Sequence, residues 1–208
     1  MAILLAPAAV VYLSFNAGGF FPVASGIVAI VCAQALLLRT LIADHPFEGF
    51  NWRLGVPLVA LALFAAWELA SALWSHAPAR AIDDFDRTLL YLLVFAFFGS
   101  FASDAARVRW LVRGLVAGIT VVCLLALLSR VLPHVWSTRL SYASSRLNYP
   151  LTYWNAEGLL AAVGLVLGFH LTCDGEEPAV VRVIAAALLP VIAATLLFTF
   201  SRGAVGAT

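Results

Sequence analysis

The sequence is short of charge and has no lysine at all. All 12 of its basic residues are Arg, and charged residues make up 11% of the 208 residues, against 63% for hydrophobic residues. A soluble domain carries about 25% charged residues, because a chain folded in water needs a polar exterior. The composition therefore excludes a soluble globule and predicts an integral membrane protein. Short loops hold at most three Arg, which argues against a nucleic-acid partner.

Metal-ligating and disulfide patterns are also missing from the sequence. The three cysteines have no C-x-x-C pair, and the four histidines show no metal-ligand spacing. We interpret Cys32, Cys123 and Cys173 as small buried hydrophobic residues. The segment DDFD at 83–86 suggests Mg²⁺ binding, but a diphosphate site of that kind needs a second acidic motif, which the sequence lacks. We predict no metal and no cofactor, and expect these Asp residues to precede and favour a helix N-terminus.

Long apolar runs are what the sequence does contain. A membrane-spanning helix needs about 20 predominantly apolar residues. We predict an all-α, polytopic transmembrane bundle of about seven helices, forming a single membrane domain over residues 1–208. The longest loop is predicted around 130–155, and Asn155 with Glu157 is typical of a helix start. The predicted helices are 1–16, 20–38, 54–74, 88–103, 110–129, 156–173 and 183–200.

The Arg residues are spread evenly over the two sides of the membrane. Cytoplasmic loops normally carry an excess of Arg, yet seven alternating helices leave six Arg on each side. One side therefore carries Arg against the topological preference, which suggests that these residues have a function. An even number of predicted helices separates Arg87, Arg146 and Arg202, so all three are predicted to lie on one side.

Three segments, in this order, resemble one bacterial family. They are ELASALWSHAPARAIDDFDRTLLYLLVF, SRLNYPLTYWNAEGLLAAVGL after the longest loop, and LLFTFSRGA near the end. With the helices between them, they resemble the O-antigen ligase and O-antigen polymerase family of membrane proteins, and the YWNA variant is most similar to actinobacterial members. The resemblance covers nearly the whole chain and is strongest from about residue 65 onwards.

The resemblance implies an activity and its partners. Full-length members are bundles of roughly a dozen helices in the inner or plasma membrane, with an extracytoplasmic active face. They transfer a glycan from undecaprenyl diphosphate to an acceptor hydroxyl on a glycan or lipid, without a metal or a nucleotide sugar. A His on a large outer loop of the C-terminal half is thought to act as the base. We therefore expect this chain to be an N-terminal portion that holds no catalytic residue and is inactive alone.

Arg146 and Arg202 are the main candidates for binding the diphosphate of the lipid-linked donor. Negative charge builds on the leaving oxygen during transfer, and Arg supplies both fixed charge and paired hydrogen bonds. The alternative for Arg202 is a side chain that reaches the membrane surface and caps the C-terminus of its helix. Arg87 is a lesser candidate, since it can simply pair with Asp83 or Asp86.

Two carboxylates and a group of aromatic residues are further candidates. Glu68 lies inside a predicted helix, where ionisable groups are expensive and usually functional. We expect it to pair with an Arg such as Arg87 or to be protonated. Glu157 stands where the family pattern predicts an apolar residue, and its role stays open. The remaining candidates either contact the glycan or lipid or form an aromatic belt at the membrane interface. They are Tyr142, Tyr149, Tyr153 and Trp154, with Asn155 beside them.

Two other classes of function remain open. A small-solute or anion transporter would use Glu68 and the Arg residues as a pathway, although the paired, interrupted helices typical of transporters are not visible. A non-catalytic membrane scaffold would tolerate wholesale substitution of the 130–155 loop, whereas an enzyme site would not. Within the enzyme class, the sequence fits ligation and polymerisation equally.

Overall fold

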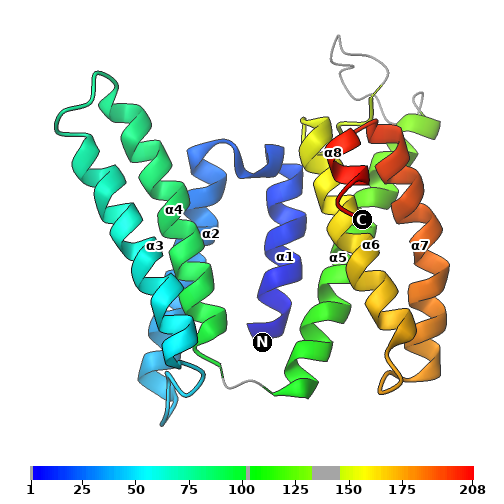
Figure 1. The fold of residues 1–208 in the computed structure, drawn as a ribbon, viewed down its shortest axis with the longest axis horizontal. Coiled ribbons are helices and arrows are strands. Elements are labelled where there is room, and N and C mark those ends of the chain that lie inside the picture. The colour runs from blue at the N-terminus through cyan, green and yellow to red at the C-terminus, as the bar shows by residue number, and fades with distance from the viewer. Residues whose placement is uncertain (1, 102–103, 133–145) are drawn as a thin grey trace. The chain divides into compact units, whose positions relative to one another are not determined.

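The computed structural model describes residues 2–101, 104–132 and 146–208. Every regular element within these ranges is a helix (Figure 1). The chain divides into two compact units, one of Met1–Gly18 with Ala106–Thr208 and the other of Gly19–Ala105. The elements are α1 (Ala2–Phe15), the 3-10 turn η1 (Ala17–Gly19), α2 (Pro22–Ile42), α3 (Trp52–Ser71), α4 (Pro78–Gly99), α5 (Ala105–Val131), α6 (Trp154–Cys173), α7 (Ala179–Thr199) and α8 (Arg202–Val205).

Five of the described helices are long and apolar enough to cross a membrane. They are α2, α3, α5, α6 and α7, of 20 to 27 residues each. Helices of this length match the thickness of a bilayer, and their backbone groups are satisfied within each helix. The chain is therefore a multi-pass membrane protein, and the prediction of an all-α polytopic bundle is confirmed.

Helices α1 and α4 differ from the spans that hydropathy predicted. The α1 helix has only 14 residues, and α4 begins at Pro78 rather than at residue 88. Pro is favoured in the first turn of a helix, where its missing N–H has no partner to lose. The DDFD segment consequently lies inside α4, so the expectation that it precedes a helix N-terminus is wrong. Hydropathy marks only the apolar part of a helix and misses a polar extension.

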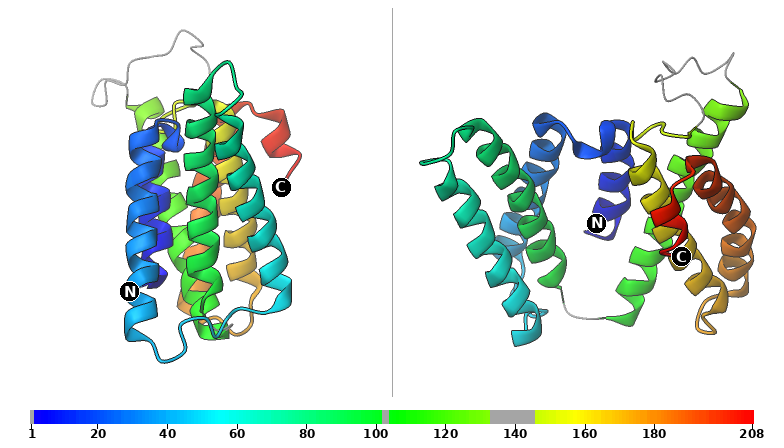
Figure 2. Two further views of the ribbon diagram at one scale, coloured as in Figure 1. Left: turned by 90° about the vertical axis from the view of Figure 1, so that its left-hand side faces the viewer. Right: turned by 45° about the horizontal axis from the view of Figure 1, so that its top comes forward.

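In the first unit, α5, α6 and α7 share a tightly packed core. Its centre is formed by Ile119 and Cys123 from α5, Ala161 from α6 and Ile192 from α7. The Thr195 hydroxyl donates a hydrogen bond across the core to the Cys123 carbonyl at 3.1 Å. The short α8 packs against both α6 and α7, at the end where α6 begins and α7 ends (Figures 1 and 2).

In the second unit, α4 packs against both α2 and α3. Arg39, near the end of α2, donates hydrogen bonds to the carbonyls of Ser100 at 2.9 Å and Pro46 at 3.0 Å. Its guanidinium also lies 4.0 Å from the centre of the Phe101 ring. A cation is favoured at a helix C-terminus, where carbonyl groups are left unpaired. Arg39 thus fastens the C-terminal ends of α2 and α4 together.

The cysteines follow the sequence interpretation in two cases of three. Cys32 and Cys123 are buried in α2 and α5, as predicted, and Cys173 is exposed. The interpretation of Cys173 is wrong because it is the last residue of α6, where the chain leaves the packed helix for the loop to α7.

Candidate functional site

Arg146 and Arg202 line one pocket, although 55 positions of sequence separate them. The pocket has a volume of about 780 Å³ and is completed by Leu197, Phe200, Ser201, Val205 and Gly206. Arg146 precedes α6 and Arg202 follows α7, so the antiparallel pair of helices returns the chain to the same end. The prediction that these two Arg lie on one side is confirmed. The Leu147 backbone N–H also donates to the Phe198 carbonyl at 2.9 Å, which ties the Arg146 segment to the last turn of α7.

A tight turn between α7 and α8 sets the direction of Arg202. Phe200 adopts the left-handed conformation, with φ of 52° and ψ of 30°, which costs a non-glycine residue about 1–2 kcal/mol. Ser201 then caps α8, since its side chain accepts from the Ala204 N–H at 3.4 Å. The buried Thr199 hydroxyl accepts from the Ser201 N–H at 3.3 Å. These polar contacts fix the backbone on both sides of the strained residue and leave Arg202 exposed.

The pocket carries positive charge that the described residues do not neutralise. The Arg146 guanidinium lies 5.1 Å from the centre of the Trp154 ring, an arrangement that orients a cation without using its N–H groups. The hydrogen bonds and ion pairs of the described residues leave the Arg202 guanidinium unpaired, so it does not cap the C-terminus of α7. No acidic residue is among those lining the pocket in the described part of the chain. Two such guanidinium groups suit a polyanion such as a diphosphate.

The aromatic residues before α6 are placed around this end of the unit. Tyr149 packs edge-on against Phe15, with ring centres 6.1 Å apart, and Tyr153 is 50% exposed. Asn155 lines a neighbouring pocket of about 320 Å³ with Leu159, Ser201, Gly203 and Ala204. Tyr149, Tyr153, Trp154 and Asn155 remain candidates for glycan or lipid contact. Tyr142 lies outside the described residues.

The α6 helix begins at Trp154, two residues before its predicted start at 156, and its cap is different. The helix begins at Trp154 after Tyr153, whose side chain makes no capping hydrogen bond. Asn155 lies within the first turn, and its side-chain amide donates to the Tyr153 hydroxyl at 2.7 Å. The interpretation of Asn155 as the cap is therefore wrong: Tyr153, whose backbone is extended, occupies the cap position, and the helix has already begun at Trp154. Glu157 does lie in the first turn, as predicted.

Arg87 lies in the other unit, and its guanidinium is already engaged there. It donates to Asp84 at 3.1 Å and to the Phe20 carbonyl at 3.1 Å. The sequence suggested pairing with Asp83 or Asp86; the partner is Asp84, one helical turn away on the same face of α4. This pairing favours a structural role over diphosphate binding. Its position on the same side as Arg146 and Arg202 stays a prediction.

Glu68 is a partly buried carboxylate in α3 whose partner is not Arg87. One carboxylate oxygen, Oε2, is buried and makes no hydrogen bond within the described residues. The pairing with Arg87 is not formed, because Arg87 bonds to Asp84 and Phe20 instead. The other expectation, that Glu68 is protonated, stays a prediction.

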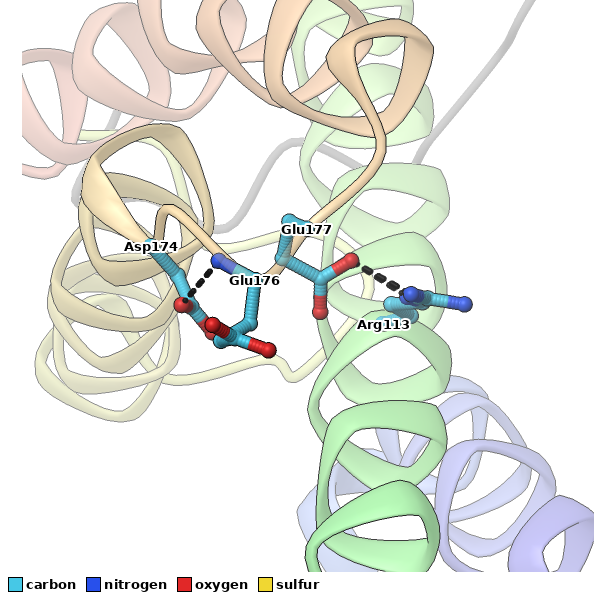
Figure 3. A network of polar contacts seen from close by, with 4 residues as sticks. All are labelled: Arg113, Asp174, Glu176 and Glu177. Carbon is cyan, nitrogen blue, oxygen red and sulfur yellow. Dashed lines mark hydrogen bonds and ion pairs between the residues drawn. The ribbon is translucent and has the colours of Figure 1, made fainter.

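A buried ion pair at the opposite end of α6 and α7 was not predicted from the sequence. Arg113 of α5 donates through Nε to Glu177 Oε2 at 2.8 Å, and the Glu177 side chain is fully buried (Figure 3). Beside it, the Asp174 carboxylate accepts from the Glu176 N–H at 2.9 Å and shapes the loop between the helices (Figure 3). An acidic pair before Pro in a short loop between two membrane spans was the only available signal.

Comparison with known proteins does not place this chain in a family: no family model matches it, and no curated protein or solved structure matches it either. The resemblance to O-antigen ligases therefore stays a prediction based on the three segments.

Proposed function

We propose that the chain belongs to an O-antigen ligase-like enzyme, a glycan ligase or polymerase that uses undecaprenyl diphosphate as the carrier of its donor glycan. One observation carries this proposal: Arg146 and Arg202 line a common pocket, and among the described residues neither guanidinium is paired to a carboxylate. The three segments quoted above supply the family, and the pocket joins the second of them to the third. The active face is taken to be extracytoplasmic and the membrane to be the inner or plasma membrane.

The reaction explains why two unpaired guanidinium groups would be needed. The bond between the anomeric carbon of the glycan and the diphosphate oxygen breaks, and the acceptor oxygen forms the new bond to that carbon. The leaving diphosphate gains negative charge in the transition state, which fixed cations stabilise. Arg146 and Arg202 would bind and orient this group through charge-assisted hydrogen bonds. The acceptor hydroxyl gives its proton to a base that this proposal does not assign to any described residue.

The aromatic residues and Asn155 would extend the site toward the glycan or the polyprenyl chain. Trp154 already lies against Arg146, and the neighbouring pocket lined by Asn155 is separated from the Arg pocket by Ser201, which lines both. A sugar ring stacks on exposed aromatic faces such as that of Tyr153, while amide groups bind sugar hydroxyls.

The proposal predicts that Arg146→Ala or Arg202→Ala, made in the full-length protein, causes lipid-linked glycan to accumulate in cells. Arg→Lys at either position should restore little activity, because the planar pair of donors is lost. The readout is the ratio of lipid-linked to transferred glycan in membrane extracts.

Arg182→Ala is a matched control at the other end of α7. Its side chain bonds to the Thr172 carbonyl at 3.2 Å, away from the pocket, so transfer should stay normal. Normal transfer in both pocket variants would refute the assignment.

A second candidate function, a small-solute or anion transporter, is favoured by one observation: Glu68 Oε2 in α3 is buried and has no hydrogen-bond partner in the part of the chain that the structure describes. A transport pathway would make flux into vesicles depend on this carboxyl, so Glu68→Gln would abolish uptake of a small anion. Unchanged flux in Glu68→Gln would remove the support for this function.

A further inference from the structure

Glu157 is a fully buried carboxylic acid for which the proposed reaction has no use. Its exposed fraction is 0%, and neither carboxylate oxygen makes a hydrogen bond within the described residues. The Leu151 backbone amide lies beside the carboxyl without reaching hydrogen-bond geometry. An ionised carboxylate without a partner in an apolar interior is strongly disfavoured. The neutral, protonated form is the one that this packing accommodates.

Within the described residues no side chain donates a hydrogen bond to Glu157, and the α7 hydroxyl groups at this end of the unit are already used. On α7, the Thr195 hydroxyl already donates to the Cys123 and Val191 carbonyls, and the Thr199 hydroxyl donates to the Leu196 carbonyl. The Cys123 thiol of α5 is close enough to the carboxyl to interact with it electrostatically. The other ionisable groups on the described elements at this end are Tyr12 of α1, Arg130 of α5, Arg202 of α8, and Arg146, Tyr149 and Tyr153 before α6.

The position next to Glu157 is in direct contact with the turn that presents Arg202. A Cβ atom on Gly158 would lie 2.9 Å from Thr199 Oγ1 and 3.0 Å from the Cβ atoms of Ser201 and Ala204. The first turn of α6 therefore has no free space against the α7–α8 turn. Arg146 is held at the same place by the bond from Leu147 to Phe198. Any swelling between α6 and α7 at this level displaces both arginines.

We propose that Glu157 is a proton-binding site that keeps the junction of α6, α7 and α8 closed, and with it the Arg146–Arg202 pocket. The protonated carboxyl fits the closed junction. Loss of its proton to water creates a charge that requires water or a cation between α6 and α7, and the junction opens. This inference rests on the proposed function, because protonation of Glu157 can change anion binding only if the Arg146–Arg202 pocket binds an anion. Anion binding and protonation of Glu157 would then favour each other.

Infrared spectroscopy of the chain in lipid nanodiscs tests the protonation directly. We expect a protonated-carboxyl C=O band near neutral pH that is missing from Glu157→Gln and retained in the control Glu176→Gln, which changes an exposed carboxyl. Raising the pH should remove the same band from the wild-type chain, a result that needs no variant. A Glu157→Gln spectrum identical to that of the wild type would overturn the proposal, since Glu157 would then be ionised in the folded chain.

Binding of inorganic diphosphate, measured against pH in the same nanodiscs, tests the coupling. If only the chain with protonated Glu157 binds diphosphate, its affinity for diphosphate falls by about tenfold per pH unit once the pH is high enough for Glu157 to lose its proton. Glu157→Gln, which stays neutral, should keep its affinity over that range. Diphosphate itself titrates identically in both experiments, so the difference between the proteins isolates Glu157.

The outcomes separate this inference from the proposed function. Equal pH dependence in wild type and Glu157→Gln would overturn the coupling while leaving the pocket as a diphosphate site. Failure of both proteins to bind diphosphate at any pH would contradict the proposed function together with the coupling. The carboxyl band would still decide whether Glu157 carries a proton.

Discussion

The described arginines differ in what their guanidinium groups contact. This difference distinguishes arginines with a structural role from those that we propose to bind a ligand. Arg39 bonds to two backbone carbonyls, Arg87 to Asp84, and Arg113 to Glu177. These three hold elements of their own unit together. Arg146 and Arg202 instead line a pocket, and no carboxylate in the described ranges accepts a hydrogen bond from either of them. Arg is the better cation for a phosphate group because its donors form a planar fork.

At the residue scale, we expect that breaking the Arg113–Glu177 ion pair lowers the free energy of unfolding. Glu177→Ala leaves Arg113 partly buried without its partner, which costs about 3 kcal/mol or more. Unfolding of the chain in mixed micelles, followed by circular dichroism, measures the change. Glu176→Ala is the matched control, because the neighbouring Glu176 is exposed and its side chain is outside the pair.

The double variant Arg113→Met with Glu177→Met should recover most of that stability, since replacing a buried pair by apolar residues is often neutral. If Glu177→Ala unfolds at the same denaturant concentration as Glu176→Ala, the buried pair has no stabilising role.

Sequence reasoning reached the pocket residues but missed the buried charges. Arg146 and Arg202 were identifiable because each lies in a segment with a family-like pattern, and counting helices put them on one side. Glu177 looked like an ordinary loop acid, since burial of a side chain depends on how α5 approaches the α6–α7 loop. The roles of Glu157 and Glu68 were open for the same reason: hydropathy shows that a carboxyl enters the membrane but not which groups surround it.

At the element scale, glycine sets how closely α6 approaches its neighbours. A Cβ on Gly164 would lie 2.6 Å from Ile119 Cγ2 and 3.3 Å from Ile192 Cγ2. Gly164→Ala should therefore push α6 away from α5 and α7 and lower the free energy of unfolding by about 1–3 kcal/mol. The same unfolding measurement applies.

Gly55→Ala is the control for this substitution, because Gly55 is also helical but has nothing within 4 Å of its missing Cβ. It should be neutral or slightly stabilising, since Ala favours a helix over Gly by up to about 1 kcal/mol. An equal loss in both variants would mean that close packing at Gly164 does not decide the stability of α6.

The apolar runs predicted the membrane helices well, and the errors fall at helix ends. Five runs correspond to helices that can span a membrane. The start of α4 at Pro78 was missed because its first turns are polar, and a hydropathy window registers lipid-facing residues rather than helical backbone. The cap of α6 was misplaced because Asn155 is a good capping residue in general, whereas here its amide bonds to the Tyr153 hydroxyl.

At the scale of the whole molecule, the helix order of the first unit fixes which loops share a side of the membrane. Gly203 lies in α8 after α7, and Gly175 lies between α6 and α7. With Cys173→Ser as background, Gly203→Cys and Gly175→Cys should react with a membrane-impermeant thiol reagent from opposite faces. The proposed function predicts that Gly203→Cys reacts from the extracytoplasmic face of intact cells. Labelling of both positions from one face would contradict the span assignments of α7.

Direct binding of the donor's diphosphate is the most direct test of the central claim, that Arg146 and Arg202 form a diphosphate site. Polyprenyl diphosphate and polyprenyl monophosphate would each be titrated into nanodiscs holding the chain. We predict preferential binding of the diphosphate, weakened by about tenfold or more in Arg146→Ala and in Arg202→Ala, and unchanged in Arg182→Ala. Equal binding of the diphosphate by the wild type and both pocket variants would contradict the account.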